Sequence, residues 1–268
     1  MFKSNNSKDF LEDYVRMKRK ILSVLIVLTL AGMVILSPAL CNSKTLANGV
    51  PEPSPPAPGQ VGSGSPYKHL GAAIDYEVNT GIEVSTCVTD PLLPHDSSYN
   101  QFFYAWAMIY SYPPERWIQV GWSEVSWMDN TQYVTEYDTE DNEWYFYPQY
   151  PLTVGNSYSF RITYQGNGRW ATWIFWNNEW NLLRVASIGL YYAEYTGQFC
   201  EVYSATYFWF HAWTRLHNTR LLIGGSWLLW TTAYQTHEYN TNQPYYVRWF
   251  NKYYYWEFTD IKIGPPQA

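Results

Sequence analysis

The chain has 268 residues, of which 20% are aromatic and 15% charged, with a formal net charge of −6. Residues 1–20 carry six basic and three acidic groups, so the remainder has a net charge of −9. An acidic body argues against nucleic acid and anionic lipid as partners, because both call for basic patches. Tyrosine and tryptophan favour strands, and they also favour flat apolar surfaces that still form hydrogen bonds.

The amino-terminal segment has the composition of an export signal. Residues 1–20 end in a basic cluster, and the uncharged run ILSVLIVLTLAGMVIL follows from Ile21 to Leu36. Sixteen residues are few for a membrane span and many for the apolar part of a cleaved signal. We predict that residues 1–41 form either a cleaved signal peptide or a retained membrane anchor, with a lipid-anchored Cys41 as a further alternative. Either way, the bulk of the chain is expected to be extracellular or at the cell surface.

A linker and one domain are predicted after this segment. Residues 42–66 are crowded with proline, serine and glycine, which is typical of a semi-extended tether. Residues 67–268 are expected to form a single all-β domain, since sandwiches of about 200 residues often fold as one unit.

Short aromatic and β-branched runs, separated by turn signals, follow one another through this domain. No segment shows a helical period over 12 residues. So many short strands predict an antiparallel two-sheet sandwich, or jelly roll. The expected strands are Leu70–Val78, Gly81–Thr89, Phe102–Tyr110, Trp117–Val125, Tyr133–Thr139, Trp144–Tyr150, Ser157–Gln165, Arg169–Trp176, Trp180–Val185, Ser187–Tyr195, Gln198–Ala205, Phe208–Thr214, Leu221–Ile223, Trp227–Tyr234, Tyr245–Phe250 and Tyr254–Ile263.

For one hairpin, the sequence also predicts which side chains point toward the core. The run SYSFRITYQ alternates strictly between apolar and polar residues before the turn at 166–168. A three-residue loop would place Trp170 with Phe160 on the core face and leave Trp173 beside Arg161 on the polar face. A two-residue loop would turn Trp173 inward instead. We favour the three-residue loop.

At pattern level the chain resembles secreted jelly rolls of the concanavalin A-like lectin/glucanase type. The resemblance is carried by WIQVGW, YVTEYDT and SYSFRITYQGNGRWATWIFW, within roughly residues 100–200. It implies a two-sheet sandwich whose concave sheet often binds a glycan.

An acidic strand is the candidate catalytic site. Glu136-Tyr137-Asp138-Thr139-Glu140 looks like the Glu-x-Asp-x-Glu strand of jelly-roll glucanases. Period two places Glu136, Asp138 and Glu140 on one face. Their carboxylates could approach the ~5–5.5 Å separation of a retaining glycosidase pair. The alternative is a solvated hairpin, because Glu140 opens a run that is typical of a turn.

A sugar-binding platform is the second candidate site. Rings stack on the apolar faces of sugars while polar side chains bond the hydroxyls. Gln119, Glu136, Arg161 and Trp173 are polar-face residues of neighbouring expected strands, so they would cluster. The alternative is an ordinary solvated face with a cross-strand Arg–Glu pair, or a cation–π contact of Arg161 on Trp173.

Cysteine and histidine spacings carry little chemistry. Cys87 and Cys200 could form a disulfide in an exported domain, or remain two free buried thiols. No zinc-like spacing or cofactor motif occurs, so neither a metal nor a cofactor is expected. The oxygen-rich loops at 129–130 and 141–142 lack the spaced ligands of a calcium loop and are interpreted as turns.

The sequence therefore predicts an exported β-sandwich that binds a polysaccharide or surface glycan without cleaving it. One alternative is a glycoside hydrolase or polysaccharide lyase on the same fold. Another is a structural cell-surface protein whose aromatic faces pack against a partner protein.

Overall fold

The structure is a computed structural model that describes residues 67–93, 100–111, 115–129, 131–204, 213–239, 241–242 and 245–260. These residues form strands, turns and loops; no helix long and apolar enough to cross a membrane occurs among them. The export segment expected at 1–41, the linker at 42–66, and most of the strand expected at Phe208–Thr214 lie outside the described residues.

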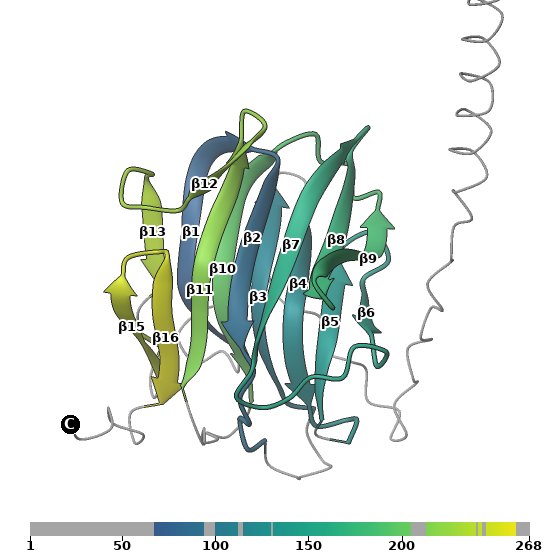
Figure 1. Ribbon diagram of the computed structural model, residues 1–268, viewed down its shortest axis with the longest axis vertical. Coiled ribbons are helices and arrows are strands. Elements are labelled where there is room, and N and C mark those ends of the chain that lie inside the picture. The colour runs from purple at the N-terminus through teal and green to yellow at the C-terminus, as the bar shows by residue number, and fades with distance from the viewer. Residues whose placement is uncertain are drawn as a thin grey trace, which may run out of the picture. The chain divides into compact units, whose positions relative to one another are not determined.

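The strands form two sheets that lie face to face, as the sequence predicted (Figure 1). Every pairing within them is antiparallel. One sheet has seven strands in the order β13-β1-β10-β3-β4-β5-β6. These are β1 (Tyr67–Asn79), β3 (Phe102–Ser111), β4 (Arg116–Val125), β5 (Gln132–Asp138), β6 (Glu143–Phe146), β10 (Ala193–Tyr203) and β13 (Thr236–Tyr239).

The other sheet has nine strands. Eight follow the order β14-β15-β16-β11-β2-β7-β8-β9, and β12 pairs with β11 outside this path. They are β2 (Gly81–Cys87), β7 (Ser157–Gly166), β8 (Arg169–Trp176), β9 (Glu179–Ala186), β11 (Thr214–Ile223), β12 (Ser226–Leu229), β14 (Thr241–Asn242), β15 (Tyr245–Asn251) and β16 (Tyr255–Asp260).

The main core lies between the two sheets and draws apolar side chains from both. On β4, Ile118, Val120 and Trp122 point into it, as their alternation predicts. The Trp122 indole nitrogen donates to Thr86 Oγ1 at 3.0 Å and so links one sheet to the other. β3 is buried along its whole length, which confirms the prediction for FFYAWAMIY.

The hairpin of β7 and β8 has the predicted facing. Arg161 lies opposite Trp173, and Phe160 lies opposite Ile174. Trp170 is fully buried, whereas Trp173 is half-buried on the outer side. Residues 166, 167 and 168 all have positive φ, which suits their Gly-Asn-Gly sequence.

Several predicted strand bounds differ from the structure, most clearly at Ser187–Tyr195. Residues 187–190 form no strand, and β10 begins only at Ala193. The Gly189 amide instead bonds the carbonyl of Gly168, so this stretch runs against a hairpin turn and not along a strand. Gly224 and Gly225 form the tight turn that joins β11 to β12, with positive φ at both residues.

A second apolar cluster lies on the outer face of the seven-stranded sheet. Its members come from β1, β3, β4, β5, β6 and β10, and they include Tyr104, Trp106, Trp117 and Phe199. All four are at most 8% exposed, so this sheet is dry on both faces. Much of the aromatic content of the described residues therefore lies in two buried layers.

Candidate functional site

The three predicted catalytic carboxylates surround a single arginine. Glu136 and Asp138 share a face of β5 as predicted, but that face is the interior one and both are fully buried. Arg184 of β9 contacts Asp138 through one terminal nitrogen, which also lies 3.3 Å from Glu136 Oε1. Its other terminal nitrogen contacts Asp141 and lies 3.8 Å from Glu140 Oε2. Glu136 and Asp138 therefore do not line an open groove, whereas Glu140 and Asp141 lie in the exposed turn of the β5–β6 hairpin, as the alternative predicted.

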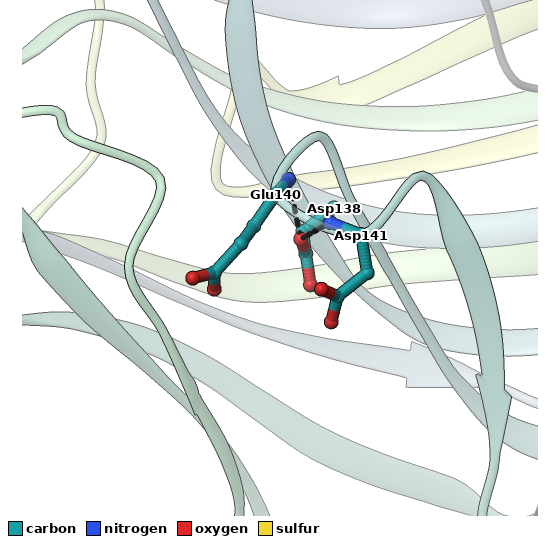
Figure 2. A group of neighbouring side chains, drawn as sticks. All are labelled: Asp138, Glu140 and Asp141. Atoms are coloured by element: carbon teal, nitrogen blue, oxygen red, sulfur yellow. Dashed lines mark hydrogen bonds between the residues drawn. The ribbon is translucent and has the colours of Figure 1, made fainter.

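The turn after β5 holds the remaining acids in place. Figure 2 shows Asp138, Glu140 and Asp141 projecting from this turn, with the backbone amides of Glu140 and Asp141 bonded to Asp138 Oδ1 at 2.7 and 3.3 Å. One carboxylate oxygen from each of the three lies within 4.8 Å of the others, a spacing that would suit a cation. Arg184 already supplies positive charge to this group, so the cluster is best explained as an internal ion-pair network.

Glu136 is the most completely bonded of these acids. Tyr147 and Thr172 each donate a hydroxyl to Oε2, at 3.0 and 2.5 Å, and Arg184 contacts Oε1. Burial raises the pKa of Glu136, and these three partners oppose that rise by stabilising the ionised form. A carboxylate whose two oxygens are both engaged holds the sheets together.

The predicted sugar-binding cluster is not assembled. Gln119 faces outward from the seven-stranded sheet, whereas Glu136 faces the interior, because β4 and β5 pair Gln119 with Tyr137 and not with Glu136. Arg161 and Trp173 belong to the nine-stranded sheet, on its outer face. These four residues therefore lie on three different surfaces, and only Arg161 and Trp173 share one.

Arg161 makes the contacts that the structural alternative anticipated, with different partners. It forms an ion pair with Glu83, with nitrogen–oxygen distances of 3.0 and 2.5 Å. Its guanidinium lies over Trp180 at 3.7 Å and Trp227 at 4.7 Å, measured to the ring centroids. The cation–π contact expected on Trp173 is thus made with tryptophans of β9 and β12.

Of the two alternatives for Cys87 and Cys200, the structure has two free thiols and no disulfide between them, with Cys200 buried and Cys87 partly accessible. Cys200 lies in the core of the seven-stranded sheet, where burial raises its pKa well above the usual range. Cys87 ends β2 in the other sheet, and its sulfur lies 3.6 Å from the carbonyl of Gly155.

A group of unpaired polar side chains on the outer face of the seven-stranded sheet was missed by the sequence analysis. Glu201 of β10 is fully buried, and neither of its carboxylate oxygens has a hydrogen-bond partner among the residues that the structure describes. His69 of β1 lies directly opposite in the register, with its Nε2 3.0 Å from Glu201 Oε1. This contact has ion-pair distance without hydrogen-bond geometry, so both ring nitrogens also remain unsatisfied.

Aromatic residues surround this pair. Tyr104 is the neighbour of Glu201 on β3, and its hydroxyl is already donated to the carbonyl of Thr135. The ring of Trp106 meets that of His69 edge-on at 6.1 Å, and its indole nitrogen has no partner. Leaving one buried polar group unpaired costs about 1–3 kcal/mol, and more if it is charged. Such a concentration of unpaired groups requires an explanation, and a catalytic role, stored strain and a bound water or ion are the ones known from other proteins.

Gln119 belongs to the same face but not to this pair. Its amide nitrogen is also buried and unpartnered. It lies opposite Met108, however, four residues along β3 from the Tyr104 position that neighbours Glu201.

A signal for Glu201 was present in the sequence, because Phe199, Glu201 and Tyr203 alternate and place one carboxylate in an aromatic row.

Comparison with known proteins identifies solved structures with a similar fold. No protein-family model matches this sequence, and no curated protein does. Among solved structures, the chain is similar to a scytalido-glutamic peptidase with a transition state analog inhibitor, at a TM-score of 0.52 and 11% identity. It is also similar to SCP-B, a member of the Eqolisin family of peptidases, in complex with the tripeptide Ala-Ile-His, at 0.51 and 10%. Both alignments cover 72% of this chain and 98% of the other.

At such low identity the likeness establishes the β-sandwich alone. These neighbours are peptidases, whereas the sequence resemblance pointed to lectins and glucanases of the concanavalin A type. What the two groups share is the sandwich architecture, and that part of the expectation is confirmed.

Proposed function

We propose that this chain is a hydrolase of peptide bonds and that Glu201 and His69 form its proton-transfer pair. The observation that carries the proposal is the fully buried carboxylate of Glu201, whose oxygens have no hydrogen-bond partner and which has an imidazole nitrogen 3.0 Å away. The similarity of the fold to two peptidases supports the reaction class. A carboxylate beside a histidine is a common arrangement for general acid–base catalysis.

The chemistry of this pair would serve attack by water on an amide. The Glu201–His69 pair would accept a proton from water as its oxygen bonds to the amide carbon. It would then return that proton to the departing amine nitrogen as the C–N bond breaks. The unpaired indole N–H of Trp106 is a donor available to the carbonyl oxygen, where negative charge develops.

The test is proteolysis of a mixed peptide library by the full chain, followed by mass spectrometry between pH 3 and 8. Glu201→Gln should lower the cleavage rate roughly 100-fold or more, the usual contribution of general acid–base catalysis. Glu124→Gln is the matched control, because Glu124 is equally buried but lies on the other side of its sheet. Equal activity in Glu201→Gln and the parent would refute the assignment.

Glycan binding is the second candidate function, and one exposed surface favours it. Trp173, Trp180 and Trp227 lie around the Arg161–Glu83 ion pair on the outer face of the nine-stranded sheet, where rings and polar groups alternate. Glycan-array binding that is lost in Trp180→Ala but kept in Phe250→Ala would support it. Binding that survives Trp180→Ala would remove this surface from consideration.

The location proposed for this activity is outside the cytoplasm. The basic and apolar composition of residues 1–41 supports export or anchoring of the domain, and residues 42–66 have the composition of a tether. Cell fractionation with protease protection of the full chain would test this placement.

A further inference from the structure

A cavity that does not include Glu201 is lined by residues of the nine-stranded sheet and its loops. Its volume is about 460 Å³, within the usual range for small-molecule sites. The ends of β2, β7, β11 and β16 and the loop before β16 provide its walls. The lining residues are Cys87, Gly155, Ser157, Arg215, His217, Asn218, Asn251, Tyr254 and Tyr255.

One charged side chain, among the residues that the structure describes, lines this cavity. None of the described lining residues carries a carboxylate, and the carboxylate of Glu257 is paired with Arg215. Arg215 supplies the positive charge. Its Nε donates to Glu257 Oε1 at 2.8 Å, while its two terminal nitrogens have no partner among the described residues and its side chain is 53% exposed.

Neutral hydrogen-bonding groups surround this arginine. His217 Nε2 lies 3.2 Å from Ser157 Oγ. The Tyr254 hydroxyl donates to Asn218 Oδ1 at 2.7 Å, which holds the Asn218 side chain at the rim. Burial and, to a lesser extent, the charge of Arg215 lower the pKa of His217, against the opposing hydrogen bond of Asn218. The two terminal nitrogens that the Glu257 pair leaves free match two oxygens of a carboxylate or phosphate.

We propose that this cavity binds a small organic oxyanion, a carboxylate or phosphate monoester carried on a ring-sized group. The oxyanion pairs with the free terminal nitrogens of Arg215. The ring occupies the volume beside Tyr254 and Tyr255, whose side chains offer aromatic surface. This site is separate from the proposed peptidase pair and does not depend on it.

Cys87 provides a site-specific readout, because it lines the cavity and is partly accessible, whereas Cys200 is fully buried. The full chain is labelled with N-ethylmaleimide at pH 8.5, and modification of the Cys87 peptide is followed by mass spectrometry. The probes are benzoate, phenyl phosphate, inorganic phosphate and neutral benzamide. We expect benzoate or phenyl phosphate to slow the labelling of Cys87 severalfold and benzamide to leave it unchanged. Protection by inorganic phosphate alone would assign the site to free phosphate and overturn the ring-sized ligand.

Substitutions identify the group responsible. Arg215→Gln should weaken the protective binding roughly 10-fold or more, the usual effect of losing a charge-assisted hydrogen bond. Arg220→Gln, on the same strand outside the cavity, should change nothing. Arg215→Lys retains the charge beside Glu257, so it should fold and keep part of the affinity even if Arg215→Gln does not fold. Equal protection by benzoate and benzamide, or no protection by any anion at 10 mM (about 2.7 kcal/mol of binding free energy), would overturn the proposal.

Discussion

Three buried glutamates on the seven-stranded sheet differ in how well they are bonded. Glu136, between the sheets, has two hydroxyl donors and an arginine. Glu124 has the side-chain amide of Gln132. Glu201, on the outer face, has no hydrogen-bond donor. Burial alone therefore does not separate these three acids, whereas the number of bonded partners does. The satisfied glutamate stabilises the fold, and the proposed function rests on the unsatisfied one.

The largest expected change in the free energy of unfolding concerns Glu136, the glutamate with the most bonded partners. Arg184→Met removes the cation that faces Glu136 and Asp138 and leaves two buried carboxylates without it. Breaking a buried ion pair in this way typically costs about 3–5 kcal/mol. Urea denaturation should show a loss of that size in the free energy of unfolding. A loss below about 1 kcal/mol, the range of exposed pairs, would mean that this network is not the sheet-to-sheet tie described above.

Glu124 should make the free energy of unfolding depend on pH, an effect of intermediate size. Burial raises the pKa of Glu124 from 4.5 to about 7, against the opposing effect of its hydrogen bond from Gln132. Between these two values the unfolded chain has lost the proton and the folded chain retains it, so the free energy of unfolding falls as pH rises. At 1.36 kcal/mol per pKa unit the fall amounts to about 3–4 kcal/mol.

The measurement for Glu124 is a difference between two proteins. Thermal or urea unfolding of the parent and of Glu124→Gln is compared at intervals from pH 4.5 to 7.5. The variant should lack the fall that the parent shows in this window. Parallel curves would indicate that Glu124 ionises normally and is better solvated than its burial implies.

The smallest expected effect has the opposite sign. Glu201→Leu replaces a buried carboxylate that accepts no hydrogen bond from the described residues with an apolar side chain of similar size, in an aromatic environment. We expect the free energy of unfolding to rise by about 1–2 kcal/mol, because the variant removes a buried polar group whose lost hydration no hydrogen bond offsets. The same variant should lose the proposed activity, as expected where function is maintained at a cost in stability. A destabilised Glu201→Leu would place this residue with Glu136 among the structural acids.

Alternation and turn residues in the sequence determined much of this fold. The two-sheet class, the buried strand FFYAWAMIY and the facing of the β7–β8 hairpin all follow from local patterns, because side-chain period and turn length are properties of a few consecutive residues. Tertiary structure decided which face of each strand is interior. Glu136 and Gln119 both looked like polar-face residues, but the pairing of β4 with β5 places them on opposite sides. The residue that contacts each acid could not be predicted from the sequence either. Arg184 contacts Glu136 from 48 residues away in the chain, and His69 contacts Glu201 from the far end of the described domain. Hydrogen bonding across such separations depends on sheet order and register, and a single strand's sequence contains neither.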